Sequence, residues 1–508
     1  MFPSFVSPVV RSKGSVRAPV DLQRCRFIRF LELLGSSAVC TVLSVVVLTA
    51  SAAESLKIGS RRELFVDDYL VDRLVNARQV LHAPQPRETV LRLEEPWEGV
   101  YSGYFTVLHD GEKFRMYYRG MPEAKHDFDT EVTCYAESRD GVQWTKPALR
   151  LFEVRGRLDN NVILARHRAC HNFSPFLDTN PGAKESERFK ALGGTGKPGL
   201  VALVSPDGIH WRDLQGDPVI TQGAFDSQNV SFWSETEQRY VCFFRIFTND
   251  VRWISRTSST DFVHWTDPVM MEVGDQPMEH LYTNQTSPYF RAPQIYLGMP
   301  TRFFPGRKVL SDERTAAIGT ARGFDFRNDC ADIILSSTRG GANFPRTFME
   351  AFIRPGLDLK NWTSRANYAA HGFLQTGPEE LSVYVNHNVG YASSHIQRYT
   401  LRLDGFASVQ GPYGGGELVT PPLVFEGSRL TMNYSTSAAG GVRVELQDLA
   451  GTPIPGFSLE DCPEVIGDEI ERVVGWTAGS DVGALAGRSV RLRIYLKDAD
   501  LFSLRFVP

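Results

Sequence analysis

Three carboxylates are the strongest candidates for catalysis: Asp226 in FDSQN, Glu279 in MEHLY and Glu379 in PEEL. Hydrolysis of a glycosidic bond needs one carboxylic acid that protonates the leaving oxygen. It also needs a second carboxylate that acts as nucleophile or as base for water. Acids that converge in space raise one another's pKa, which keeps one of them protonated near neutral pH. The sequence predicts catalysis by these three residues, provided that the fold brings them together.

A second set of residues could bind and orient a substrate. Arginine and histidine donate strong hydrogen bonds to carboxylate or sulfate groups, and amides and carboxylates bond hydroxyl groups. The predicted substrate-binding residues are Glu98, Arg119, His171, Asn229, Arg245, His280, Arg302 and Glu380. Each also has a structural interpretation, as a turn cap, a buried hydrogen-bonded histidine or a brace between sheets. Because side chains alternate along a strand, Glu379 and Glu380 should point to opposite faces.

Metal and nucleotide motifs are missing from the sequence. No C-x-x-C occurs, and the five cysteines beyond residue 53 are widely scattered, so neither a zinc site nor a disulfide framework is expected. LGGTGK at 192–197 lacks the spacing of a phosphate loop and a helix to follow it. The sequence therefore predicts no cofactor.

A repeated phrase indicates how the chain positions these residues. It reads SRDGVQW at 138–144, SPDGIHW at 205–211 and STDFVHW at 259–265, and a looser form, SSTRGGANF, ends at Phe344. The Ser and Asp side chains can bond nearby backbone and fix a tight turn, and Asp-Gly is a hairpin signal. The intervals suit one four-stranded blade of a β-propeller. The Ser, Asp and Trp of each copy are expected to be structural.

The rest of the chain supports an all-β fold. Strand-like runs and polar turns alternate from residue 94 onward, and no long amphipathic helix is present. The predicted blades begin near residues 94, 171, 225, 282 and 376. After GPYGGGE at 411–417 the strands alternate strictly, as in a small antiparallel sandwich. We expect a five-bladed β-propeller over 54–410, followed by a C-terminal β-sandwich over 411–508.

The first 53 residues differ in character from the remainder. A basic stretch precedes an uncharged run, LLGSSAVCTVLSVVVLTASAA at 33–53, which ends in small residues typical of a cleavage site. Residues 1–53 are predicted to be a signal peptide, with an uncleaved membrane anchor as the alternative. The protein is therefore expected to be secreted or periplasmic. Net charge is −4 and no basic patch is present, so no nucleic-acid partner is expected.

The predicted architecture, with S-x-D-x-x-x-W hairpins, resembles the five-bladed propeller glycoside hydrolases of the invertase and arabinanase kind (families 32 and 43). STDFVHWTDP at 259–268 is the phrase most similar to theirs. The resemblance implies an active site in the funnel where the innermost strands begin. It also implies an axial calcium ion as an alternative to no metal, with His171 and His280 as added ligands. The Asn-Asp-Pro-like, Arg-Asp-Pro and Glu-Cys motifs of the invertases are missing here, so their catalytic roles are not transferred.

The resulting functional prediction is a secreted glycoside hydrolase that acts on a complex polysaccharide or oligosaccharide through funnel carboxylates. Two alternatives stay open because a fold does not fix chemistry. One is a non-catalytic carbohydrate-binding or surface-scaffold protein. The other is a lyase or transferase with a base such as Tyr282 or His280.

Overall fold

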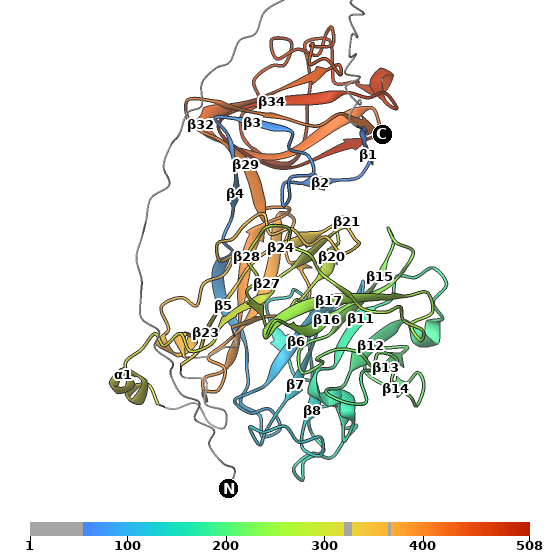
Figure 1. Ribbon diagram of the computed structural model, residues 1–508, viewed down its shortest axis with the longest axis vertical. Helices are drawn as coiled ribbons and strands as arrows, with labels where there is room; N and C mark the ends of the chain where they lie inside the picture. The colour runs from blue at the N-terminus through green and yellow to red at the C-terminus, as the bar shows by residue number, and fades with distance from the viewer. Residues whose placement is uncertain (1–53, 320–327, 364–366) are drawn as a thin grey trace, which may run out of the picture. The chain divides into compact units, whose positions relative to one another are not determined.

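The computed structural model describes residues 54–319, 328–363 and 367–508 (Figure 1). Within these ranges the chain is almost entirely β, and the one α-helix there, α1 (Asp312–Ala317), has 6 residues. The expected all-β class is confirmed. The predicted signal peptide, 1–53, lies outside the described residues. Among the helices of the described ranges, none has the length and apolar character needed to cross a membrane.

Three antiparallel sheets follow one another in the first half of the chain (Figure 1). The second and third are meanders in which successive strands pair, and in the first sheet the last two strands both pair with the third. The first sheet contains β6 (Gly103–His109), β7 (Phe114–Gly120), β8 (Val132–Ser138), β9 (Trp144–Thr145) and β10 (Val162–Ala165). The second contains β11 (Ser174–Leu177), β12 (Phe189–Gly193), β13 (Val201–Ser205) and β14 (Arg212–Asp213). The third contains β15 (Val230–Ser234), β16 (Arg239–Thr248), β17 (Val251–Ser259) and β18 (Val269–Met270).

The next part of the chain forms two short sheets and a longer one. The short sheets are β20 (Ser287–Tyr289), β21 (Ala292–Gly298) and β24 (Ser336–Thr338), and β19 (His280–Leu281), β22 (Thr301–Phe304) and β23 (Cys330–Ile333). The longer sheet contains β25 (Tyr368–Ala369), β26 (Leu374–Gln375), β27 (Glu380–His387) and β28 (His395–Arg402). Its last strand is β5 (Gln85–Arg92), which pairs with β28. An early strand therefore completes the last of these sheets.

The first strands of these sheets lie next to one another in a ring. β6 neighbours β11, β11 neighbours β15, β15 neighbours β20, and β25 and β26 neighbour β6. Buried side chains join them across the axis: Gln228 donates to Phe105 O and Thr106 Oγ1, and Gln285 donates to Gln228 Oε1. Because buried amides cost free energy unless they are bonded, this network stabilises the closed ring.

The three repeated turns have the same hydrogen bonds. In the second copy, Ser205 Oγ accepts from the backbone N–H of Gly208, and Asp207 Oδ1 accepts from Ile209 and His210. Trp211 Nε1 donates to Gly208 O. The first and third copies repeat these bonds. The residue after Asp is left-handed in every copy: φ is +72° at Gly141, +74° at Gly208 and +66° at Phe262.

A large sheet is built from strands of both ends of the described chain (Figure 1). Its long strands are β32 (Arg429–Gln447) and β34 (Arg491–Val507), joined by β29 (Ala407–Gly411), β30 (Gly416–Val419) and β33 (Asp468–Val473). The N-terminal strands β2 (Glu63–Leu64), β3 (Arg73–Val75) and β4 (Arg78–Leu81) pair with β34, β30 and β29. β1 (Leu56–Gly59) pairs in parallel with β31 (Leu423–Phe425).

The pairing of these N-terminal strands does not follow the expected domain boundary between residues 410 and 411. Residues 56–81 were expected in the propeller segment, yet their strands pair with C-terminal strands and Ile58 and Phe65 enter the same buried core as Leu446 and Ile494. The physical reason is that an apolar run predicts a strand but not its partner. Pairing over a long sequence distance is decided by tertiary packing.

Replacing Asp207 with Ala should lower stability without changing the fold. The variant loses the Asp207 acceptor for two backbone N–H groups and for Ser205 Oγ. We expect the free energy of unfolding to fall by about 1–2 kcal/mol, as for a lost cap. Denaturant unfolding followed by tryptophan fluorescence measures this change. The control is Asp217→Ala, at an exposed position in the following loop; equal unfolding free energies in the two variants would contradict the structural role.

Candidate active site

Side chains from the starts of the first strands meet at one end of the ring. Tyr104 lies at the start of β6, Asp226 just before β15, and Tyr368 at the start of β25. His171 ends the short 3-10 helix η1 (Arg168–His171) before β11. The Tyr104 ring lies 5.9 Å from His171 and 6.0 Å from Tyr368, which stacks in turn on Tyr282 at 5.5 Å. The sequence prediction that these strand starts share one mouth is consistent with these contacts.

The backbone at Tyr104 is unusual for a non-glycine residue. Its φ is +55°, in the left-handed region. The register between β6 and β7 shifts between Gly103 and Thr106. A bulge of this kind re-aims a side chain, and strained backbone is often found at functional sites. Here the bulge directs the Tyr104 ring onto His171 and Tyr368.

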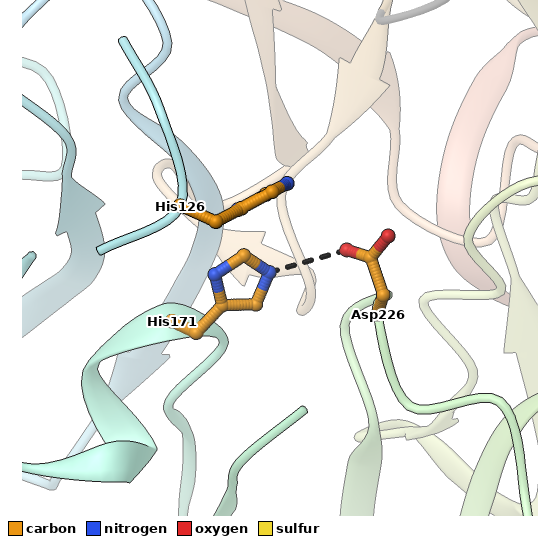
Figure 2. Close-up of side chains that lie close together, drawn as sticks. All are labelled: His126, His171 and Asp226. Atoms are coloured by element: carbon orange, nitrogen blue, oxygen red, sulfur yellow. Dashed lines mark hydrogen bonds and ion pairs between the residues drawn. The ribbon is translucent and has the colours of Figure 1, made fainter. Parts of the chain in front are cut away.

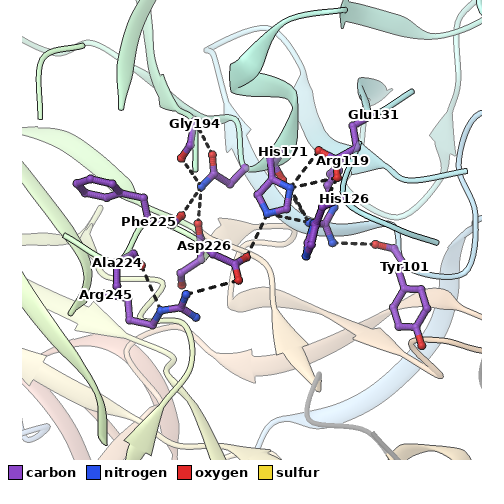
Figure 3. A network of polar contacts seen from close by, with 12 residues as sticks. Tyr101, Arg119, His126, Glu131, His171, Gly194, Ala224, Phe225, Asp226 and Arg245 are labelled. Carbon is purple, nitrogen blue, oxygen red and sulfur yellow. Dashed lines mark hydrogen bonds and ion pairs between the residues drawn. The ribbon is translucent and has the colours of Figure 1, made fainter. Parts of the chain in front are cut away.

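The centre of the site is His171, whose ring is held between two carboxylates (Figures 2 and 3). Its Nδ1 lies 3.0 Å from Glu131 Oε2, and its Nε2 lies 3.2 Å from Asp226 Oδ1. His171 and Glu131 are fully buried, whereas the Asp226 side chain is 47% exposed. A substrate can therefore reach Asp226, while Glu131 lies behind the imidazole.

A second imidazole lies against the first. His126, in the segment between β7 and β8, has its ring centroid 4.6 Å from that of His171. Its Nδ1 lies 3.5 Å from Glu131 Oε1, and its side chain is 49% exposed. Glu131 thus contacts the Nδ1 atoms of both histidines. Figure 2 shows that His126, His171 and Asp226 converge.

Two arginines flank this cluster (Figure 3). Arg119 Nη1 lies 3.4 Å from His171 Nε2, and its Nη2 donates to Tyr101 O at 3.0 Å. Arg245 Nη2 lies 3.7 Å from Asp226 Oδ2, and its Nε donates to Ala224 O. Both guanidinium groups are buried and also lie over tyrosine rings, Arg119 over Tyr104 and Arg245 over Tyr282. Cation–π contact adds to the attraction that holds them there.

Both carboxylates of the cluster are ionised near neutral pH. Burial alone would raise the pKa of Glu131, but hydrogen bonds from His126 and His171 outweigh it and lower the pKa to about 2. Burial opposes the ionisation of Asp226 too, and the His171 hydrogen bond and nearby positive charges bring its pKa below the ordinary value. Burial raises the pKa of Tyr104 and of Tyr368 well above normal, so both hydroxyls stay neutral.

Four of the predicted site residues are therefore brought together: Asp226, Arg119, His171 and Arg245. Glu279 and Arg302 form a different group. Glu279 Oε2 accepts from the buried Arg346 at 2.6 Å and lies 3.7 Å from Arg302 Nη1. Arg302 also makes two hydrogen bonds to Asp332. Glu279 and Arg302 are therefore bonded to partners within the protein.

The acids at the start of β27 face other partners. Glu379 is exposed, and its carbonyl accepts from Leu403 N. Glu380 Oε1 accepts from Thr376 Oγ1 and pairs with Arg398 at 2.7 Å. No contact in the described residues links either acid to Asp226.

Three further predicted binding residues make internal hydrogen bonds. Asn229 is fully buried and donates to the carbonyls of Phe225 and Ser227. His280 Nδ1 accepts from Arg252 N. Glu98 is fully buried and pairs with Lys146 at 2.6 Å. The contact with Lys146 gives Glu98 a structural role, since a buried charge is stable only when paired. The buried Oδ1 of Asn229 has no hydrogen-bond partner among the described residues, and His280 is half-buried.

Sequence reasoning missed four members of the cluster: Tyr104, His126, Glu131 and Tyr368. His126 and Glu131 lie in AKHDFDTEV at 124–132, whose acids and histidine precede a strand start. That signal resembles the one used for Asp226. It was missed because the segment follows the second strand of its sheet rather than the fourth, and only the fold brings it to the ring axis.

An apolar cavity of about 770 Å³ lies at the opposite ends of the first strands. Its lining includes His109 at the end of β6, Leu177 at the end of β11, and Phe232 of β15. The predicted catalytic residues do not line it. Its walls carry little of the charge that hydrolytic chemistry needs, so the polar cluster around His171 is the better candidate.

No family model and no curated protein matches this sequence. Solved structures show similarity. An N-acetylgalactosamine deacetylase from F. plautii, in complex with blood group B trisaccharide, is 11% identical with a TM-score of 0.42; the match covers 65% of this chain and 97% of that chain. The Bombyx mori family GH32 β-fructofuranosidase is 10% identical with a TM-score of 0.39, over 84% of this chain and 95% of that chain.

A family GH130 structure, described as a glycoside hydrolase that targets β-1,2-mannosidic linkages in Candida mannan, is 12% identical. Its TM-score is 0.37, over 63% of this chain and 93% of that chain. All three similarities are at low identity and at TM-scores below 0.5.

Replacing Glu98 with Gln should destabilise the protein because Glu98 is a buried partner. The carboxylate accepts from Tyr118 Oη at 2.6 Å and pairs with Lys146, which would lose its counter-charge. We expect the free energy of unfolding to fall by about 2–4 kcal/mol. Denaturant unfolding measures this, with the exposed Glu94→Gln as control. A variant as stable as the control would show that Glu98 is free to serve a ligand instead.

Proposed function

We propose that the chain is a hydrolase that acts on a carbohydrate at the cluster around His171. The observation that carries the proposal is the His171 ring, held between the buried Glu131 and the accessible Asp226. A carboxylate that is ionised, half exposed and hydrogen-bonded to an imidazole is suited to activating water or attacking an electrophilic carbon.

The walls of the site suit a carbohydrate. Sugar rings present apolar C–H faces that pack on aromatic rings, and hydroxyls that need hydrogen-bond partners. Tyr282, which is half-buried, is the accessible ring of the stack with the buried Tyr368 and Tyr104, and it lies against Arg245. Arg119 and Arg245 add fixed positive charge. Because guanidinium groups bind carboxylate and sulfate strongly, we propose an acidic polysaccharide or oligosaccharide as substrate.

The first candidate bond is the glycosidic bond, with Asp226 as nucleophile or as base for water. This reaction ordinarily takes two carboxylates that face the substrate. Asp226 faces it, whereas Glu131 lies behind His171, and Glu279 is bonded to Arg346. The acid that protonates the leaving oxygen is therefore not supplied by the predicted trio of Asp226, Glu279 and Glu379.

The second candidate is removal of an acyl group from a sugar, and the single accessible carboxylate favours it. Attack on an acyl carbonyl needs one activated water and donors for the oxyanion that forms. Asp226 can orient the water, and the neutral Tyr104 hydroxyl and the Arg119 and Arg245 guanidinium groups are donors beside it. The two candidate bonds release different products, so one assay distinguishes them.

The finer features of architecture and location also belong to the proposal. We propose that the ring of sheets is a five-bladed propeller in which β19–β24 make up one split blade. We propose that the strands around β32 and β34 form the accompanying β-sandwich. The basic and then uncharged character of residues 1–53 supports secretion or a periplasmic location.

Asp226→Asn should abolish hydrolysis. We expect kcat/KM to fall by about 10²–10⁴-fold, because the amide neither accepts a proton nor attacks carbon. The protein is incubated with neutral, uronic acid-bearing, sulfated and acetylated polysaccharides. Mass spectrometry follows sugar release, and an enzymatic assay follows acetate release. Asp217→Asn, at an exposed position outside the site, is the control.

Each result of this experiment has a defined meaning. Sugar release that Asp226→Asn abolishes supports the glycosidic bond, and acetate release that it abolishes supports the acyl bond. Hydrolysis that survives in Asp226→Asn contradicts the proposed site. Binding without release from any substrate supports the carbohydrate-binding alternative, and unsaturated or transferred products support a lyase or transferase.

Arg245→Ala should weaken the binding of acidic substrates in particular. We expect KM for a uronic acid-bearing oligosaccharide to rise about 10–100-fold, with a smaller change for a neutral one, because a charge-assisted bond is lost. Steady-state kinetics on the two substrates measure this. The matched control is Arg239→Ala, an exposed arginine of the same strand β16. An equal loss on neutral and acidic substrates would contradict a charge-specific role.

A further inference from the structure

We propose that His126, His171 and Asp226 bind one divalent transition-metal ion, and that Glu131 fixes the two imidazoles that hold it. The binding site stands on the geometry of these four residues. The part that such an ion would play in hydrolysis rests on the function proposed above.

The ligand types suit such an ion. Two imidazole nitrogens and one carboxylate oxygen are the donor set of many zinc and non-haem iron sites. One ligand atom from each of His126, His171 and Asp226 lies within 4.8 Å of the others (Figure 2). Bonds of about 2.1 Å allow ligands up to about 4.2 Å apart. Because His126 is 49% exposed, a small rotation of its side chain closes the difference.

Glu131 supplies the outer support that histidine ligands ordinarily have. A metal-bound imidazole usually donates its other N–H to a carboxylate, which fixes the ring and its tautomer. Glu131 Oε2 lies 3.0 Å from His171 Nδ1, and its Oε1 lies 3.5 Å from His126 Nδ1. One buried carboxylate therefore engages the Nδ1 atoms of both rings, and the Nε2 atom of His171 faces Asp226.

The contact between His171 and Asp226 also indicates a cation position. With Nδ1–H donated to Glu131, Nε2 and Asp226 Oδ1 are two acceptors 3.2 Å apart. A metal ion placed between these two atoms would be bonded by both. The carboxylates of Glu131 and Asp226 lie on either side of the His171 ring, and the guanidinium groups of Arg119 and Arg245 lie nearby.

Other histidine–carboxylate pairs of the chain lack these features. His210 pairs with Asp207 and His264 with Asp261, each three residues apart within a repeated turn. The two histidine side chains are largely exposed and the two aspartates about half exposed. Across the described part of the chain, the cluster around His171 is the group in which three such ligand atoms converge. The exposed turn histidines therefore serve as matched controls.

An ion at this position would be open on the substrate side. Three protein ligands leave coordination positions for water, and a bound divalent cation lowers the pKa of that water toward neutrality. Tyr104, Arg119 and Arg245 surround the same position. A bound ion would therefore activate a water molecule by itself. The cluster has only one carboxylate that faces the substrate, Asp226, and a second would not be needed.

Metal binding can be measured without any substrate. The full-length protein is stripped with a chelator and titrated with Co²⁺, whose visible spectrum reports nitrogen and oxygen ligation, and with Zn²⁺ by calorimetry. We expect one ion per chain. His126→Ala should weaken binding at least about 30-fold, and Glu131→Gln about 10–100-fold. His264→Ala should leave the affinity within about 2-fold, because its ring lies outside the cluster.

The outcomes separate the metal site from the proposed function. Wild-type binding no tighter than that of His126→Ala overturns the metal site, even if hydrolysis is found. Tight binding that His126→Ala weakens supports the site, even if no substrate is hydrolysed. His126→Ala leaves the buried Glu131 bonded to His171, so this variant should stay folded in the stripped state, with a melting temperature below that of the wild type. If the buried Glu131→Gln variant fails to fold, the His126→Ala variant alone tests the metal site.

Discussion

The structure depends on the closure of the first strands into a ring in which they share one direction. Thr106 pairs in parallel with His371, and Gln228 and Gln285 join the strands across the axis through buried hydrogen bonds. Since these amides are sealed from water, removing one of them from the closed ring would leave its partner unbonded at a cost of about 1–3 kcal/mol. The shared direction has a chemical consequence: residues just before each first strand gather at one end, and the apolar strand ends gather at the other.

At the polar end, one buried carboxylate organises the rest of the site. Glu131 contacts the Nδ1 atoms of His126 and His171, and His171 carries this order on to Asp226. Burial of an ionised acid is tolerated because two imidazoles bond it. This arrangement places a buried and an exposed imidazole beside an accessible carboxylate, at a cost in stability. Such an arrangement is more typical of a functional centre than of a structural ion pair.

Part of the site was predictable and part was not, for identifiable reasons. Asp226 and His171 follow from the expectation that strand starts share one mouth, and Arg119 and Arg245 from the expectation of arginines that bind substrate. Glu279 satisfied the same rule of position, but Arg346 reaches it from a distant segment and bonds it. Glu98 was predicted to bind substrate, but its side chain is fully buried and pairs with Lys146. Sequence patterns predict where a side chain lies along its strand. They do not predict which positively charged residue from a distant segment will bond it.

The sequence by itself determined the all-β class and the repeated turns, because both depend on local chemistry: alternating apolar residues, and Ser and Asp oxygens that bond backbone two or three positions away. Tertiary structure alone decided that β5 completes the last sheet of the ring and that β1–β4 pair with C-terminal strands. It also decided that His126 and Glu131 meet His171. These pairings join residues far apart in sequence, so packing and burial select them rather than any local preference.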